Sequence, residues 1–424
     1  MVLRGLLAGG VVGVLGHRGL SILWAPLAAV LAAALGTFVL AARGAPFSLP
    51  ALALAAICAA GAHLASRRGF RIVVESSLVL FVVLSHLWLC GLLPGVYRQA
   101  VPRIDAKIDR EPAPETYEFD GRVYLRTYYL MKQGMPFYQA FGTAHAGDRR
   151  HDGPPAQKLN YREPLLYEIW RWLPGHTGES LRVWFVVYSI AVLLAAYALA
   201  RTFVGPGPAL LSPILLSGYF TAATWSTWFL FSELWSGGAA VIALLALVRG
   251  RWWMGGLLVT ATIALRELMI FLIPAYAVAW LLDGKRRETR LALAAALVAP
   301  ALALGIHWLV APGALIHSGG DLSPWMQGGL QTLMAALAFS SDFIANGHAV
   351  LLAAPVAALV GASLARPRWR AGLLLTAIVL PLIGLYAVSA GEYGYYWGAI
   401  LQPIVIAVAP LSLQRFDPAE TRSD

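Results

Sequence analysis

The sequence predicts an all-α protein: a polytopic bundle of about twelve transmembrane helices with a partly helical external loop. Hydrophobic residues make up 59% of the 424 residues, charged residues make up only 13%, and the mean hydropathy is +0.67. A water-soluble domain of this size needs more charge to cover its surface, so the excess apolar residues must face lipid. The apolar residues also form separate runs of roughly membrane-spanning length, and basic residues gather in the short connections between them.

The apolar runs give the individual helices and the division of the chain. A helix needs about 20 apolar residues to cross a bilayer. We expect two extra spans within residues 1–71, a main transmembrane domain over 72–413 and a cytoplasmic tail over 414–424. The pair 252–265 and 267–283 is too short to cross a full bilayer straight. The predicted spans are 20–42, 47–66, 72–95, 181–200, 207–226, 231–248, 252–265, 267–283, 291–311, 347–365, 371–391 and 396–413.

The basic residues of the short connections orient the predicted bundle. They fall on one side of it, with Arg43 as the exception, and a surplus of Lys and Arg marks the cytoplasmic side. Both termini are then cytoplasmic, and the loops 96–180 and 312–346 lie on the periplasmic or extracellular side of the inner (plasma) membrane. The residues that set this orientation are Arg67, Arg68, Arg71, Arg249, Arg251, Lys285, Arg286, Arg287, Arg290, Arg366, Arg368 and Arg370.

The sequence lacks the motifs and charge patterns that are typical of several classes of function. The net charge of +10 is spread over short loops and forms no basic stripe on a soluble face, so we expect no nucleic-acid partner. Cys58 and Cys90 both lie in apolar runs, which excludes a disulfide framework in the external loop. The chain has no Walker A loop, dinucleotide fingerprint or HExxH motif, and no compact zinc spacing, so we predict no metal site.

The loop 96–180 is far more polar than the rest of the chain. Between Arg98 and Glu179 it holds 11 of the 22 acidic residues together with 12 Lys and Arg. Long ordered loops on a rigid scaffold commonly carry function. The alternative is a solvated cap that performs no chemistry.

One carboxylate of this loop stands at the start of a predicted helix. In the segment 117–141, Tyr124 and Tyr128 recur at helical spacing, and Gly134 followed by Met-Pro ends the helix. Asp120 lies near its first turn, where the helix dipole keeps a carboxylate ionised. Such a residue is either a functional acid or only a helix cap.

A cationic segment follows at 158–175, where Lys158 and Arg162 precede Glu163 and Pro164. An apolar, aromatic helix then approaches the membrane. The planar guanidinium of Arg162 suits phosphate recognition because its donors match phosphate oxygens. The alternative is an Arg162 that pairs with Glu163 or with a lipid headgroup.

Three charged residues lie within or between apolar runs. Glu233 stands at the outer end of its span, and Arg266 and Glu267 lie between the two short spans. Ionisable residues at such positions are costly and usually face a cavity or the bundle interior. The short helices suggest a water-filled recess with Arg266 at its floor. The alternative is an Arg266–Glu267 or Arg266–Glu233 pair that binds no ligand.

The order of these features resembles the GT-C superfamily of membrane glycosyltransferases, which use polyprenyl-phosphate sugars; among its members are aminoarabinose, protein O-mannosyl, and mycobacterial-type mannosyl and arabinosyl transferases. The resemblance covers about 72–413 and differs from the family in three ways. Asp120 has Glu118 two residues before it rather than a usual Asp-Glu or Asp-x-Asp pair, two extra spans precede the first usual one, and no large C-terminal domain follows. The matching segments are "KQGMPFY" after Asp120 and Tyr124, "YREPLLYEIW", "ESLRVWFVVY", Glu233, "GGLLVTATIALRE" and "GEYGYYWGAILQPIVI".

The resemblance implies a site and a reaction. Asp120 would be the general base, with Glu118 as its alternative. The donor would be a polyprenyl-phosphate sugar, the acceptor a lipid, glycan or protein, and the anomeric configuration would invert. The protein would work among membrane lipids with no certain cofactor, and a divalent metal stays open without support from the sequence. The implied donor-phosphate ligands are Arg162, Arg266 and Lys158, and the implied supporting residues are Tyr124, Tyr161, Glu163, Glu233, Glu267 and Tyr393.

Two other functions compete with glycosyl transfer. A transporter or flippase for a lipid-linked or anionic substrate predicts pseudo-repeats and broken helices at the bilayer midplane. We find no convincing repeat, and the charged residues gather towards the predicted outer face. A non-enzymatic assembly scaffold would not need Asp120, Arg162 and Arg266 to converge.

Overall fold

All regular secondary structure in the residues that the computed structural model describes is helical, and no strand occurs among them. The predicted all-α class is therefore confirmed for these residues. The predicted spans 20–42 and 47–66 lie outside the described part, and 347–365 is described only at residue 361. The described residues are 68–92, 119–146, 155, 158, 161–225, 227–283, 286–313, 329–330, 333, 336, 361, 368–387 and 397–413.

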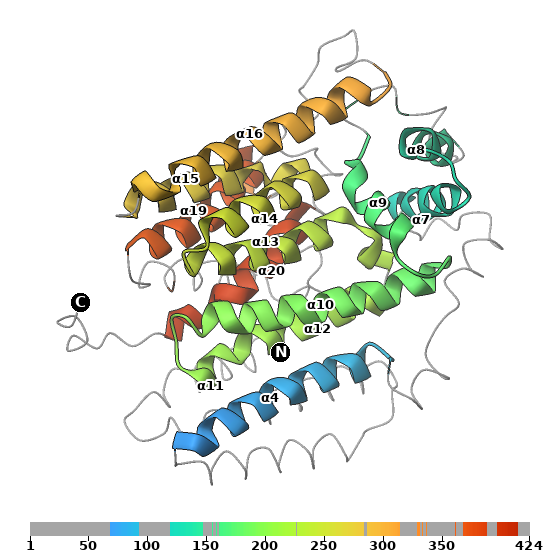
Figure 1. Ribbon diagram of the computed structural model, residues 1–424. Coiled ribbons are helices and arrows are strands. Elements are labelled where there is room, and N and C mark those ends of the chain that lie inside the picture. The colour runs from blue at the N-terminus through green and yellow to red at the C-terminus, as the bar shows by residue number, and fades with distance from the viewer. Residues whose placement is uncertain are drawn as a thin grey trace.

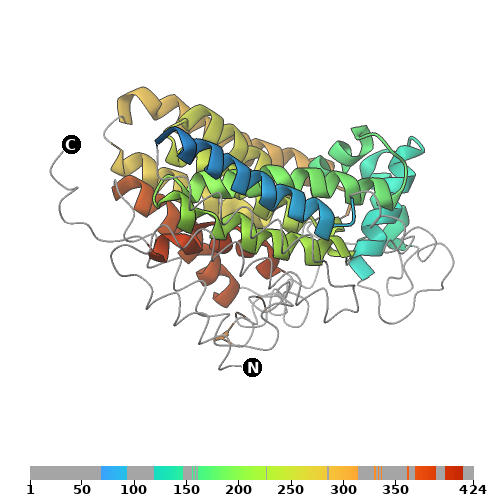
Figure 2. The same cartoon turned by 90° about the horizontal axis from the view of Figure 1, so that it is seen from below.

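The remaining predicted runs coincide with apolar helices that lie along a common axis in both views (Figures 1 and 2). One helix, α4, ends earlier than expected, at Leu89 instead of 95. The long helices are α4 (Arg68–Leu89), α10 (Gly178–Ala200), α12 (Leu211–Trp225), α13 (Ser232–Val248), α14 (Trp252–Leu265), α15 (Leu272–Leu282), α16 (Arg286–Val310), α19 (Arg368–Ala387) and α20 (Gly398–Val408). Short helices join or extend them: α11 (Pro206–Ala209), η2 (Thr227–Leu230), η3 (Glu267–Phe271) and η7 (Ala409–Leu413).

Three of these helices are long and apolar enough to cross a membrane: Gly178–Ala200, Thr289–Val310 and Trp369–Ala387. The outer face of α16 shows why lipid is a suitable surrounding. Leu302 is 60% exposed and Leu309 is 82% exposed on this face. Exposing such side chains to water costs free energy that a lipid environment avoids. The described bundle is therefore compatible with a membrane protein.

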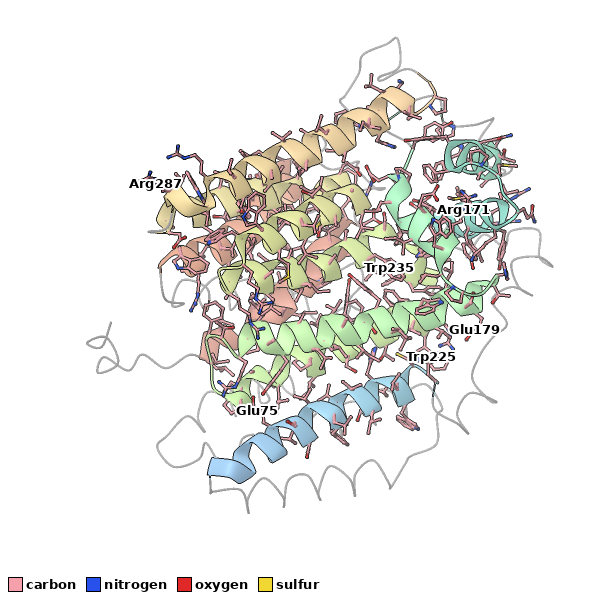
Figure 3. All side chains as sticks on the ribbon, viewed as in Figure 1. Glu75, Arg171, Glu179, Trp225, Trp235 and Arg287 are labelled. Atoms are coloured by element: carbon pink, nitrogen blue, oxygen red, sulfur yellow. The ribbon has the colours of Figure 1, made fainter. Side chains whose placement is uncertain are left out.

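Basic residues mark one end of the bundle. The Nε of Arg370, at the start of α19, donates to the carbonyl of Val248 at the end of α13, 2.9 Å away. The rings of Trp252 and Trp369, at the starts of α14 and α19, lie 5.5 Å apart. Figure 3 places Arg287 at this same end and Arg171 at the other. The arginines that precede or begin α14, α16 and α19 thus share one end.

The opposite end carries the described part of the polar loop: α7 (Phe119–Lys132), α8 (Phe137–Ala146) and α9 (Pro164–Trp172) (Figure 1). The helix expected after residue 117 forms as α7, and Gly134 ends it with a φ of 98° that favours glycine. A second helix, α8, begins directly after Pro136.

Aromatic rings fix α9 to the bundle. The ring of Trp170 in α9 is fully buried and lies 6.1 Å from the ring of Trp235 in α13. On its other sides lie the rings of Tyr128, at 6.4 Å, and Tyr167, at 5.2 Å. Large rings of this kind contribute much of the buried area of a core. They hold α7 and α9 against the start of α13, where the charged residues meet.

Candidate functional site

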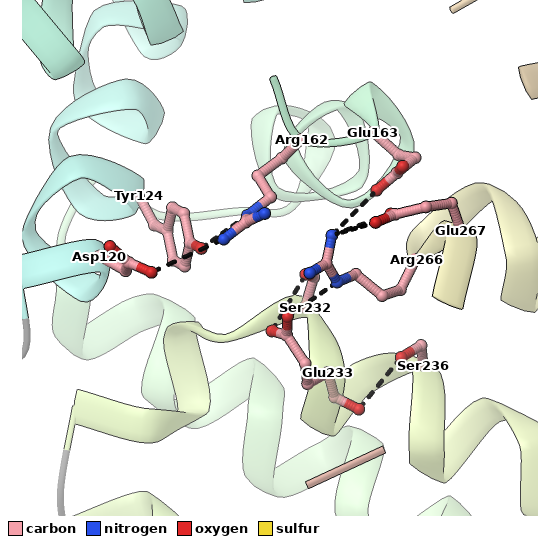
Figure 4. Close-up of polar contacts among 9 residues, drawn as sticks. All are labelled: Asp120, Tyr124, Arg162, Glu163, Ser232, Glu233, Ser236, Arg266 and Glu267. Carbon is pink, nitrogen blue, oxygen red and sulfur yellow. Dashed lines mark hydrogen bonds and ion pairs between the residues drawn. The ribbon is translucent and has the colours of Figure 1, made fainter. Parts of the chain in front are cut away.

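One buried guanidinium lies at the centre of the charged residues (Figure 4). Arg266 stands between α14 and η3 in extended backbone, with φ −157° and ψ 116°, and its side chain is 2% exposed. Its Nε lies 2.7 Å from Oε1 of Glu233, and its Nη1 lies 2.7 Å and 2.8 Å from the two carboxylate oxygens of Glu267. Oε2 of Glu163 lies 4.0 Å from the same Nη1. Both pairs weighed from the sequence therefore form together, with a third carboxyl group beside them.

The helix ends place two of these carboxyl groups. Glu233 lies in the first turn of α13, and Glu267 is the first residue of η3. Carboxylates are favoured at such positions because unpaired backbone N–H groups give a helix start a partial positive charge. The hydroxyl of Ser232 also donates to Oε2 of Glu233 at 3.3 Å. The break between α14 and α15 then supplies Arg266 between the two acids.

Arg162 and Glu163 are neighbours in sequence but contact different partners. Glu163 has extended backbone, with φ −65° and ψ 136°, as expected for a residue before proline. Successive side chains of an extended chain point to opposite sides. Glu163 faces Arg266, whereas Arg162 lies 3.6 Å from Oδ2 of Asp120.

Tyr124 completes the contacts of Arg162. The Nε of Arg162 donates to the hydroxyl of Tyr124 at 2.8 Å, and the guanidinium carbon lies 5.7 Å from the ring centre. Tyr124 is one helical turn after Asp120 on α7, so both side chains meet Arg162 from the same face. Burial raises the pKa of Tyr124, which keeps its hydroxyl neutral.

The acids of the site differ in exposure. The side chain of Asp120 is 35% exposed and that of Glu267 is 27% exposed, whereas those of Glu163 and Glu233 are 4% and 0% exposed. Asp120 also occupies the first turn of α7, as predicted. It is therefore the acid of this group that a molecule outside the bundle can reach most readily.

Burial also changes the protonation of Glu163. The loss of solvent raises its pKa well above 4.5, and the nearby carboxylate of Glu267 raises it further. Glu163 and Glu267 both face Nη1 of Arg266, at 4.0 Å and 2.7 Å. Of the acids around Arg266, Glu163 is therefore the one whose neutral form burial favours.

The remaining predicted residues lie where the loop meets the end of α16. The Nζ of Lys158 donates to the carbonyl of Trp308 at 2.7 Å, a position where the helix dipole favours a cation. The ring of Tyr161 is buried and lies 6.0 Å from that of Tyr138. Lys158 thus binds a helix end, and its role towards a phosphate stays a prediction, as does the recess at Arg266. Glu118 and Tyr393 lie outside the described residues.

Sequence reasoning did not single out three residues of this region. Ser232 contacts Glu233, and the ring of Tyr167 lies 6.0 Å from that of Tyr124. The hydroxyl of Tyr138 lies at hydrogen-bonding distance from Nδ1 of His307, 2.9 Å away. The sequence signal for Ser232 was its place before an acid at a predicted helix start, whereas Tyr138 and Tyr167 resemble ordinary core aromatics in sequence.

Within the described residues, no group of three or more His, Cys, Asp or Glu side chains is arranged so that it could hold a metal ion. No known protein family, curated protein or solved structure matches this chain.

Proposed function

We propose that this chain is an integral membrane glycosyltransferase that moves a sugar from a polyprenyl-phosphate donor to a lipid, glycan or protein acceptor outside the cell membrane. The observation that carries the proposal is one connected set of contacts at one end of an apolar bundle. Asp120 contacts Arg162, the next residue Glu163 contacts Arg266, and Arg266 joins the acids of α13 and η3. An accessible acid beside a guanidinium is the pair that transfer from a phosphate requires.

The proposed chemistry is a single displacement at the anomeric carbon. Asp120 accepts the proton of the acceptor hydroxyl while that oxygen bonds to the anomeric carbon. The bond from this carbon to the donor phosphate breaks, and the phosphate leaves with both electrons. Arg162 stabilises the charge that develops on the phosphate, because its donors match phosphate oxygens. One displacement inverts the anomeric configuration.

The contacts of Arg266 argue against direct binding of the donor phosphate by this residue. Its guanidinium is buried and is engaged by Glu233 and Glu267, with Glu163 beside it. A donor phosphate would have to displace a carboxylate to reach it. We therefore assign direct phosphate contact to Arg162, and we treat Arg266 as a residue that positions the acids around it.

The membrane arrangement forms part of the proposal. We propose about twelve spans, both termini in the cytoplasm and the end with α7, α8 and α9 on the periplasmic or extracellular side of the plasma membrane. The gathering of arginines at the opposite end of the bundle supports this orientation, since basic residues favour the cytoplasmic side.

A flippase or transporter for a lipid-linked or anionic substrate is the second candidate. The observation that favours it is the buried charge of Glu233 and Arg266 among apolar helices, because intramembrane ionisable residues often mark a substrate path. A transporter moves its substrate without breaking a glycosidic bond, so product analysis separates the two functions.

Asp120→Asn tests the catalytic proposal. We expect the variant to lose transfer by about 10²-fold or more, because the amide cannot accept the proton. The measurement is transfer of labelled sugar from polyprenyl-phosphate donors to the lipid, glycan and protein fractions of membranes that contain the full-length chain. Glu168→Gln, which neutralises a carboxylate 3.7 Å from Arg171 on α9, is the matched control and should keep full transfer.

Retained transfer in Asp120→Asn would remove Asp120 as the base and point to Glu118. A wild-type protein that moves lipid-linked substrate across vesicles and forms no new glycosidic bond would support the flippase instead.

A further inference from the structure

The site contains more acids than cations. Glu163, Glu233 and Glu267 surround Arg266, and beyond them Asp120 is paired with Arg162. With every group ionised, the site would hold two uncompensated negative charges. Glu163 and Glu233, 4% and 0% exposed, lie in surroundings of low dielectric constant, whereas Glu267 is 27% exposed. Buried uncompensated charge is costly, and a carboxyl group avoids the cost by keeping its proton.

The geometry identifies which acid keeps the proton. Glu233 and Glu267 approach the guanidinium of Arg266 to 2.7 Å, a distance typical of ionised partners. Glu163 stands back at 4.0 Å from the same Nη1 of Arg266 that Glu267 contacts at 2.7 Å. Because Glu163 lies further from the cation and next to an ionised carboxylate, it is the acid that favours keeping its proton.

We propose that Glu163 is a neutral carboxylic acid that shares its proton with Glu267, and that this pair, fixed on Arg266, positions Arg162 opposite Asp120. Glu163 is the residue that can do this, because it follows Arg162 in extended backbone directly before Pro164. Anchoring its side chain to the break between α14 and α15 fixes the direction in which Arg162 leaves the chain. Glu163 and Glu267 are positioning residues in this proposal.

The surroundings of Glu163 determine its dependence on pH. Loss of its proton would leave the negative charge of Glu163 beside that of Glu267, with Arg266 already engaged. The charged and titratable groups that face it are Arg266 and Glu267 at the helix break, Tyr138 on α8, Glu233 on α13 through Arg266, His307 on α16 through Glu267, and the adjacent Arg162.

The stability of the protein should depend on pH through this proton. The pKa of Glu163 is raised by folding, so the folded protein binds the proton more tightly than the unfolded chain does. Stability is therefore lost as pH rises from about 4.5 towards the folded pKa, by up to about tenfold in the folding equilibrium constant per pH unit. Glu163→Gln keeps a hydrogen-bond donor towards Glu267 and has no proton to lose.

The experiment compares thermal unfolding of the full-length protein in detergent between pH 5 and pH 8. We expect Glu163→Gln to match or exceed the wild-type Tm at pH 8, with a gap that widens as pH rises. Glu267→Gln should lower Tm at every pH, because Arg266 loses its two-oxygen partner. Glu168→Gln on the exposed face of α9 is the control and should follow the wild-type curve.

Three results would contradict the proposal that Glu163 and Glu267 share a proton. The first is that Glu163→Gln lowers Tm at pH 8 by as much as Glu267→Gln does. Glu163 would then be an ionised partner of Arg266. The second is a rise of wild-type Tm on adding Mg²⁺ at pH 8 that Glu163→Gln lacks, which would put a cation in place of the proton. The third, which needs no variant to fold, is a wild-type infrared spectrum at pH 8 without a protonated-carboxyl band that shifts on deuteration.

A double-mutant cycle tests the positioning of Arg162. The effects of Arg162→Met and Glu267→Gln on Tm should be non-additive, whereas those of Arg171→Met and Glu267→Gln should add. Additivity in both cycles would show that the cluster does not position Arg162. The phosphate-binding role of Arg162 rests on the proposed function, but these stability measurements do not use transfer, so the two can fail separately.

Discussion

At the scale of single residues, the site depends on which way each side chain leaves the backbone. Arg162 and Glu163 are adjacent, and extended backbone sends one towards Asp120 and the other towards Arg266. A salt bridge between Arg162 and Glu163, which adjacency suggested, is replaced by these two separate contacts. The same two residues therefore link the accessible acid of the loop to the buried cation of the bundle.

Arg266→Met tests the buried part of the cluster. The variant keeps much of the side-chain volume but leaves the carboxylates of Glu233 and Glu267 without their cation. We expect the free energy of unfolding in detergent to fall by about 3–5 kcal/mol, as is typical when one partner of a buried ion pair is removed.

Arg171→Met is the matched control for that measurement. Its guanidinium is partly exposed on α9 and lies 3.7 Å from Glu168. Exposed pairs of this kind contribute about 0–1 kcal/mol. Equal losses in Arg266→Met and Arg171→Met would contradict a stabilising role for the buried cluster.

At the scale of elements, close helix contacts set the position of Glu233. Gly237 of α13 packs against α20, where an added Cβ would lie 2.7 Å from the carbonyl oxygen of Ile400 and 3.0 Å from Cγ of Pro403. Only a residue without a side chain allows this approach. Glu233 stands one helical turn before Gly237, so a shift of α13 would also move the acid away from Arg266.

Gly237→Ala measures that contact. We expect a loss of about 1–3 kcal/mol of stability, because the backbone of α20 must move to admit the methyl group. Gly384→Ala in α19 is the control, since an added Cβ there meets nothing within 4 Å. That substitution should be neutral or stabilise the helix by up to about 1 kcal/mol. A cost at Gly384 equal to that at Gly237 would point to helix propensity or lipid contacts in place of packing.

At the scale of the whole molecule, the two ends of the bundle differ in chemistry. One end carries the arginines that precede or begin α14, α16 and α19, and the other carries α7, α8, α9 and the charged site (Figure 3). A bundle that crosses a membrane with this asymmetry should present its basic end to the cytoplasm. With this orientation, the charged site would lie on the outer side of the membrane, as the proposed function requires.

Cysteine labelling in whole cells tests this orientation. Gln133 lies exposed at the end of α7, and Arg287 lies exposed at the start of α16. In a background with Cys58 and Cys90 replaced, we expect a membrane-impermeant thiol reagent to label Gln133→Cys directly. Arg287→Cys should react only after the membrane is permeabilised. The reverse pattern would invert the proposed topology, and labelling of both positions in intact cells would contradict a membrane-crossing bundle.

The sequence by itself determined the apolar helices of the described residues, the interruption at Arg266 and the helix that starts near Asp120. Each of these depends on local causes: apolar run length, a charged pair between two short runs, and an acid at a helix start. The pair Glu163–Pro164 also contained the reason for the opposite directions of Arg162 and Glu163, because proline restricts the residue before it.

Only the tertiary structure decided which charges meet. Glu163, Glu233 and Arg266 come from the loop, from α13 and from the break after α14, and their convergence depends on packing between elements far apart in the chain. Because several acids surround the buried guanidinium of Arg266, we assign this residue a positioning role instead of the phosphate contact expected from the sequence. A sequence shows each ionisable residue singly, whereas its protonation and its partner depend on the groups that folding brings within a few ångströms.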